Sequence, residues 1–170
     1  MQRHVSSHGP GRSRSSSLRR RGAVVVELIL MMPILFIMLL AIVEFGLIFV
    51  GIQQAEAAAR LGAKYAVDNN LAGGGATAGD AALIRNEVDE ALATAGFGTS
   101  ASGGVRFTEN VSGSSSAEDG TCPQASSTPP ADTIRVRVCI PLTAVTPDML
   151  STFGFSISSR RIIVDAVLPN

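Results

Sequence analysis

Two cysteines are the residues whose chemistry the sequence indicates most directly. Cys122 and Cys139 are the only cysteines of the chain and stand 17 positions apart. In an oxidising compartment, a disulfide between them would stabilise the domain by about 3 kcal/mol, because it restricts the unfolded chain. We therefore predict a Cys122–Cys139 disulfide, with two unrelated thiols as the alternative. Two cysteines at this spacing do not form a closed zinc shell, so we predict no metal site.

Catalytic arrangements find no support elsewhere in the sequence. The only histidines, His4 and His8, fall in the first eight residues, which excludes Ser-His-Asp and Cys-His arrangements for the rest of the chain. Three acids on one predicted helix are most simply a solvated face: Glu87, Asp89 and Glu90. The glycines of "AGGGATAG" lack the Lys-Ser/Thr ending of a phosphate loop. The sequence therefore predicts neither an enzyme nor a cofactor.

A long apolar run begins just after Glu27. Residues 28–43 are uncharged throughout. As a helix, residues 23–52 would measure about 45 Å, more than the roughly 30 Å hydrocarbon core of a bilayer. Pro33 is tolerable in a membrane helix, because neighbouring groups can replace the lost hydrogen bond. We therefore predict a single transmembrane helix.

The charge distribution predicts the orientation of this helix. Residues 1–26 contain six arginines and no acid, whereas the remainder carries 8 basic and 14 acidic residues. The arginines are Arg3, Arg12, Arg14, Arg19, Arg20 and Arg21. A basic end before an apolar stretch predicts that the N-terminus stays in the cytoplasm, against membrane lipid, and that residues 53–170 lie outside. Nucleic-acid binding is the competing interpretation of the arginines, but no aromatic or basic motif supports it beyond the arm.

The chain divides into five predicted parts. Residues 1–22 form a basic, Ser/Arg/Gly-rich leader, of which 1–21 should be disordered in solution. The membrane helix, 23–52, continues into an alanine-rich extension, 53–68, so that one rod reaches about Val67. A Gly-rich linker, 69–79, breaks this helix, and residues 80–170 make a small extracytoplasmic domain.

We expect this domain to be α+β, with one helix packed on a small antiparallel sheet. Asp80 is the predicted N-cap of the helix. The predicted apolar face consists of Leu83, Ile84, Val88, Ala91, Leu92 and Ala95. Strands are predicted at 104–111, 132–140 and 155–168, with a polar loop, 112–130, between the first two. Alternation places Cys139 on the face with Arg135 and Arg137, away from the core.

The segment "RRRGAVVVELILMMPILFIMLLAIVEFGLIF" resembles the start of TadE-like proteins of the tight-adherence (Flp) pilus system. The likeness rests on the Arg-Gly, the Val-Glu pair, the proline inside the span and the Glu-Phe-Gly at residues 44–46. "AEAAARLGAKYAV" resembles the usual continuation, so that the likeness covers about residues 19–67. Leu28 departs from the tyrosine that tends to follow the glutamate in major Flp pilins, and the chain is much longer. Both departures point to a minor pilin or pseudopilin.

The resemblance implies that a prepilin peptidase cuts between Gly22 and Ala23. Glu27 would then be the fifth mature residue, and would pair with the N-terminal amine of a neighbouring pilin or pseudopilin subunit during assembly. The simpler interpretation is that Glu27 only marks the membrane interface. Glu44 lies either at the outer membrane interface or against another helix, and the sequence leaves this open.

The predicted function is that of a minor pilin or pseudopilin in Flp pilus assembly. Its implied partners are other subunits, the peptidase and, indirectly, the inner-membrane platform and secretion ATPase. The expected location is the bacterial cytoplasmic membrane, with or without entry into a surface pilus. An uncleaved single-pass protein with an extracytoplasmic interaction domain in envelope secretion is the alternative. A membrane-tethered enzyme is disfavoured by the missing catalytic groups.

Overall fold

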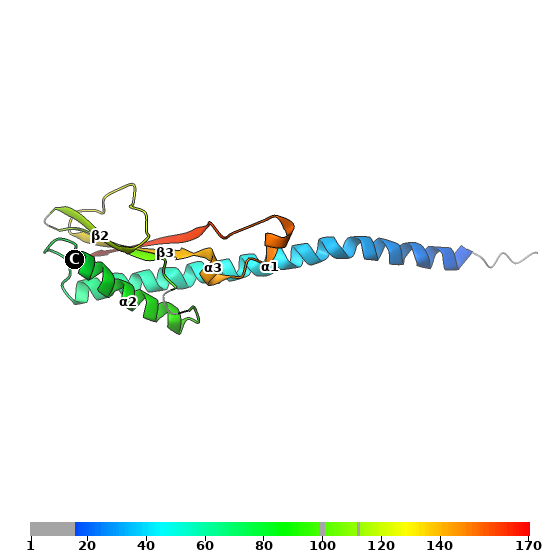
Figure 1. Cartoon of the computed structure of the whole chain (residues 1–170), viewed down its shortest axis with the longest axis horizontal. Helices are drawn as coiled ribbons and strands as arrows, with labels where there is room; N and C mark the ends of the chain where they lie inside the picture. The colour runs from blue at the N-terminus through cyan, green and yellow to red at the C-terminus, as the bar shows by residue number, and fades with distance from the viewer. Residues whose placement is uncertain (1–15, 99–100, 112) are drawn as a thin grey trace, which may run out of the picture. The chain divides into compact units, whose positions relative to one another are not determined.

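The fold is α+β, as predicted: a long N-terminal helix precedes a small domain with a helix on a four-stranded antiparallel sheet (Figure 1). The computed structural model describes residues 16–98, 101–111 and 113–170. The chain divides into two compact units, Met1–Leu39 and Leu40–Asn170. The elements are α1 (Ser16–Asp68), α2 (Ala78–Thr94), β1 (Gly104–Asn110), β2 (Ser114–Gly120), β3 (Thr133–Pro141), α3 (Leu142–Val145), the 3-10 helix η1 (Met149–Phe153) and β4 (Arg161–Pro169).

Helix α1 begins earlier than the sequence indicates. The predicted disorder of 1–21 is wrong for residues 16–21, which form the first turns of α1; residues 1–15 lie outside the described residues. The arginines there are good helix formers, and the apolar run that follows propagates the helix back through them. Pro33 lies inside α1 without ending it. Two residues beyond the helix, Asn70 adopts a positive φ of 51°, which turns the chain.

Helix α2 begins with a capping box rather than at Asp80. The N-cap is Thr77, whose hydroxyl accepts a hydrogen bond from the Asp80 backbone N–H. The Asp80 carboxylate in turn accepts one from the Thr77 backbone N–H at 3.0 Å. The predicted N-cap is therefore wrong by three positions, because Asp80 is the acidic third residue of the box.

The buried face of α2 is narrower than predicted. Its buried residues are Ala81, Ile84, Val88 and Leu92, a stripe at helical spacing. Leu83 is 47% exposed and Ala95 is also exposed, so both lie off this face. The physical reason is the small sheet and one neighbouring helix, which cover only one side of α2.

The sheet has the order β2-β1-β3-β4, with every neighbouring pair antiparallel. Strand β2 lies inside the segment predicted to be a loop. Its only apolar side chain is Ala117, so no hydrophobic alternation marks it; pairing with β1 at the edge of the sheet makes it a strand. Strand β4 begins at Arg161, six residues later than predicted.

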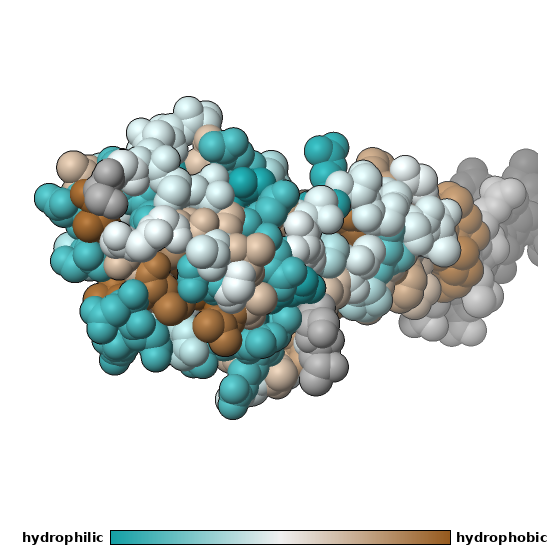
Figure 2. Space-filling model, turned by 60° about the vertical axis from the view of Figure 1, so that its left-hand side comes forward, coloured by the Kyte–Doolittle hydropathy of each residue, from teal (hydrophilic) through white to brown (hydrophobic). Residues whose placement is uncertain are grey.

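The core of the second unit lies between one face of the sheet and two helices. Alanines at helical spacing in the outer part of α1 are buried against it: Ala55, Ala58, Ala59, Ala63 and Ala66. A Cβ at Gly62 would lie 2.8 Å from Val88 and 3.1 Å from Ile84, so the glycine permits close approach to α2. The exterior is mixed: teal and white residues dominate the face in Figure 2, and brown ones gather in a few places.

Candidate functional site

The apolar part of α1 presents its side chains to the exterior. Most large apolar residues from Val24 to Val50 are 38–70% exposed, although their mean hydropathy is high. Water disfavours such a surface, whereas a lipid bilayer matches it. Helix α1 is thus long and apolar enough to cross a membrane, and is a candidate span.

The residues of the predicted processing and assembly site lie at the start of this helix. Gly22 and Ala23 have helical backbones within α1. Glu27 follows one helical turn later, and its side chain is exposed. It is the single acid between Ala23 and Val43. An exposed carboxylate among apolar side chains is costly in lipid unless a cation pairs with it.

Glu44 has a different environment from Glu27. Its side chain is only 3% exposed, whereas the adjacent Val43 and Phe45 are 43% and 61% exposed. Neither carboxylate oxygen has a hydrogen-bond partner among the described residues. The sequence left Glu44 either at the outer interface or against another helix. In the structure its own chain covers it.

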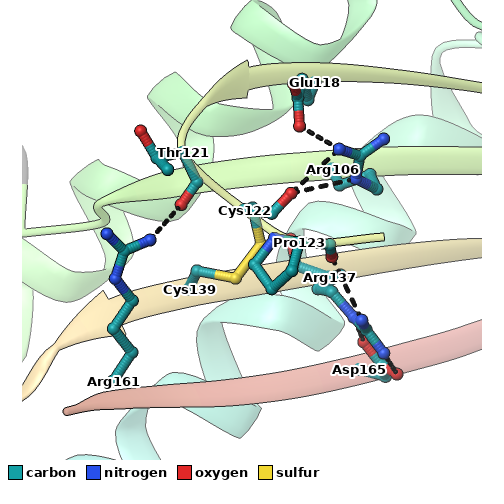
Figure 3. Close-up of a disulfide and its surroundings, with 9 residues drawn as sticks. All are labelled: Arg106, Glu118, Thr121, Cys122, Pro123, Arg137, Cys139, Arg161 and Asp165. Atoms are coloured by element: carbon teal, nitrogen blue, oxygen red, sulfur yellow. Dashed lines mark hydrogen bonds and ion pairs between the residues drawn. A yellow bond between two sulfur atoms is a disulfide. The ribbon is translucent and has the colours of Figure 1, made fainter. Parts of the chain in front are cut away.

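A disulfide joins Cys122 to Cys139 on the outer face of the sheet, opposite the helices (Figure 3). Their Cα atoms are 5.5 Å apart, within the usual range for such a bond. Cys122 is the second residue of a polar segment, which we call the cover loop (residues 121–132), and Cys139 belongs to β3. Both cysteines are buried, at 2% and 0% exposure. The bond therefore fastens the cover loop over this face.

Next to the disulfide, four charged side chains form a row across all four strands. The register aligns Glu118 with Arg106, Arg106 with Arg137, and Arg137 with Asp165. Two arginines directly opposite each other would repel, but each has an acid on its outer side. Arg106 pairs with Glu118, and Arg137 makes bonds of 2.6 and 2.7 Å to the two oxygens of Asp165.

The same arginines donate to the backbone of the cover loop. Arg106 donates from Nε and Nη2 to the carbonyl of Cys122 at 3.1 and 3.0 Å, and Arg137 donates to that of Pro123 at 3.2 Å (Figure 3). The hydrogen bond to Asp165 raises the pKa of Arg137 above its ordinary value, against an opposing effect of partial burial. The row is therefore a fixed set of charges that clamps the loop.

Further bonds extend the clamp along the cover loop. Arg135, only 9% exposed, donates to the carbonyl of Ser127. Asn110 donates from its side-chain amide to the carbonyl of Pro129 at 2.9 Å. Alternation correctly predicts that Arg135 and Arg137 point away from the helices. Alternation could not predict that Cys139 and Arg135 are buried, because their burial depends on where the cover loop folds.

A buried acid, Glu109, fastens the turn between the two long helices. It is 1% exposed and accepts from the backbone N–H of Gly73 at 2.7 Å and from the hydroxyl of Ser115 at 3.0 Å. Strand β1 thereby holds the segment that follows α1. The sequence gives Glu109 no signal beyond its place in a strand.

The three acids of α2 do not form one solvated face. Asp89 accepts from the backbone N–H of Ser102 at 2.9 Å and lies 3.5 Å from Arg85. Glu90 is exposed and Glu87 is half-buried. The prediction of a solvated face is therefore wrong for Asp89, because the segment before β1 packs across the C-terminal half of α2. Within residues 16–98, 101–111 and 113–170, no three metal-binding side chains come together.

The comparisons with known proteins concern the N-terminal segment. The family model described as TadE-like protein matches residues 22–64. This match confirms the resemblance over that segment and is consistent with a TadE-like protein of the Tad/Flp pilus system. It suggests a pilus-associated membrane protein that interacts with other pilus components. Neither the curated proteins nor the solved structures contain a significant match.

Proposed function

We propose that the chain is a minor pilin or pseudopilin-like protein that takes part in assembly of a Flp-type type IV pilus. The proposal rests on where the family match falls in the structure. The residues that match the TadE-like family, 22–64, include the apolar, exposed part of α1 and its extension into the core of the second unit. The role is structural rather than enzymatic.

In this proposal, residues 1–22 are a leader that a prepilin peptidase removes after Gly22. Arg19–Arg21 hold the site at the cytoplasmic membrane surface through attraction to anionic lipid, worth about 1 kcal/mol each. Residues 53–170 lie outside. Residues 53–68 extend the span and 69–79 connect it to the rest of the domain, 80–170.

Glu27 is the residue that we assign to assembly. Cleavage would place the new α-ammonium of Ala23 four residues from this carboxylate. A carboxylate inside a span costs roughly 2.5–3.5 kcal/mol at the membrane centre and less near an end. Pairing with the ammonium of a neighbouring subunit would recover this cost on assembly.

The test combines the processing of the chain with a count of surface pili. Gly22→Lys should block maturation, because a bulky side chain would occupy the position before the cut. The immunoblot should then show only the longer form. A mature form in this variant would refute the cleavage site.

Glu27→Ala should insert normally, because the span only becomes more apolar, and should fail to assemble pili. Glu56→Ala is the matched control, since Glu56 is an exposed acid of the same helix beyond the span. Normal piliation with Glu27→Ala would reduce Glu27 to an interface marker. An unchanged chain mass together with normal pili would favour the uncleaved single-pass alternative.

A further inference from the structure

Four of the seven phenylalanines of the chain are exposed in the second unit. They lie in two stretches: Phe45 and Phe49 in α1, at 61% and 66% exposure, and Phe153 and Phe155 near β4, at 45% and 67%. Phenylalanine is usually buried in soluble domains. The four phenylalanines and Met149, which is 37% exposed, form a set of five side chains that we call the aromatic collar.

The two stretches lie side by side. Helix α3 packs on α1, because Val145 occupies the space that a side chain at Gly51 would need. The chain then continues through η1 next to this part of α1 (Figure 1). Ile48 and Ile52 of α1 and Val145 and Ile157 are partly buried against the same core. The chain that leads to Phe153 and Phe155 therefore leaves α3 beside the stretch of α1 that carries Phe45 and Phe49, and we treat the collar as one surface.

The depth of this surface follows from the length of the apolar helix. At 1.5 Å per residue, about 20 residues cross the 30 Å hydrocarbon core. Within the predicted membrane helix, 23–52, the part that lies in the hydrocarbon core therefore ends near Val43 when it begins at Ala23. Glu44 and the collar then fall at the outer boundary of the bilayer, where interfacial segments insert phenylalanine and leucine side chains between headgroups and acyl chains.

The composition of the segment after α3 fits this boundary. Residues 149–159 contain no charged side chain, and Arg160 and Arg161 follow at once. Both arginines are exposed. An apolar and hydroxyl-bearing segment followed by cations matches the acyl edge and the anionic phosphate layer of a bilayer.

The burial of Glu44 is an independent observation at the same place. Its neighbours in α1 point outward, yet its own carboxylate is 97% covered. Glu44 itself belongs to the second unit, and η1 passes beside this stretch of helix in Figure 1. A carboxylate facing lipid is costly, so a segment seated at this level would shield it from acyl chains.

We propose that residues 149–160, together with Phe45 and Phe49, form a membrane-interface anchor that seats the extracytoplasmic domain on the outer leaflet. Phe153 and Phe155 insert at the boundary between headgroups and acyl chains, and Arg160 lies at the level of the lipid phosphates. The ligand is thus a phospholipid surface. This inference rests on the single membrane span of the proposed function.

The absence of tryptophan from the chain permits a direct measurement. A single Phe155→Trp substitution gives a unique fluorophore in the full-length protein, reconstituted in vesicles of phosphatidylcholine and phosphatidylglycerol. The proposal expects blue-shifted emission, efficient quenching by brominated acyl chains and little quenching by aqueous iodide.

The control is Leu83→Trp, because Leu83 is an exposed apolar side chain (47%) of α2, outside the collar. Its neighbour Ile84 contacts α1 at Gly62, which lies about 16 Å farther along α1 than Gly51. Leu83→Trp should respond to iodide, and its quenching by brominated lipid should be several-fold weaker than that of Phe155→Trp.

Four outcomes overturn the proposal. Iodide quenching of Phe155→Trp equal to that of Leu83→Trp would place the collar in water. Protection from both quenchers would place it against protein, such as a second copy of the chain. A Phe36→Trp reporter in the span separates the hypotheses: if brominated lipid quenches Phe36→Trp but not Phe155→Trp, the span stands and the anchor fails. If it quenches neither, the span and the anchor both fail.

Discussion

Removal of the Cys122–Cys139 bond tests how the cover loop contributes to stability. We consider the double variant Cys122→Ala, Cys139→Ala, which removes the bond without burying a new polar group. The cysteines are 17 positions apart, so the chain-entropy description gives a loss of about 3 kcal/mol in the free energy of unfolding.

This magnitude assumes that the cover loop stays in place. The assumption is reasonable, because six side chains donate to its carbonyls without help from the sulfur atoms: Arg106, Asn110, Thr133, Arg135, Arg137 and Arg161. If the loop detached instead, the nearly buried Arg135 would lose its acceptor, and the loss would exceed 3 kcal/mol by about 1–3 kcal/mol.

The assay is urea unfolding of the full chain in a mild detergent. Tyr65 is the only tyrosine and is partly buried against the core, so its fluorescence reports on the second unit. Ser127→Ala is the control, because Arg135 bonds to the backbone carbonyl at this position and not to the side chain. The control should change stability by less than about 0.5 kcal/mol.

A loss below about 1 kcal/mol with an unchanged dependence on urea would refute the reasoning, since the bond would then not restrict the unfolded chain. Free thiols in the exported wild-type protein would refute the disulfide itself. Non-reducing peptide mapping supplies that measurement.

The remaining predictions concern the core and the charged row. Glu109→Ala should cost about 2–4 kcal/mol, because the amide of Gly73 loses its buried acceptor; faster hydrogen exchange at that amide should accompany the loss, and unchanged exchange would contradict it. Gly62→Val should cost about 1–3 kcal/mol in thermal or urea unfolding through overpacking, whereas Gly46→Ala, with open space around it, should cost nothing. Arg137→Met should cost about 1 kcal/mol after allowance for solvent screening of the partly exposed pair. Because the pKa of Arg137 is raised, its contribution is fully present below the ordinary arginine pKa and is lost only as pH rises through the higher folded value. The guanidinium should therefore add no pH dependence to this cost between neutral pH and pH 10, and a decline there would show that it deprotonates.

The sequence by itself determines the features that depend on local order. An uncharged run from Leu28 to Val43 favours a span whatever the rest of the chain does, and the basic end before it indicates the orientation. Alternation in β3 identifies its two faces, since a strand reverses its side chains at every residue. The α+β class follows from these periodicities and from the single outer helix.

The tertiary structure alone decides the features that depend on which distant segments meet. Strand β2 has no hydrophobic pattern and becomes a strand only because β1 supplies its hydrogen-bond partners. The row of Glu118, Arg106, Arg137 and Asp165 exists only in one register, because a slip of one residue would reverse a strand's faces. The burial of Glu44, between the exposed Val43 and Phe45, likewise depends on how the chain packs around the helix. Local periodicity carries no information about such encounters, since they depend on how the whole chain packs.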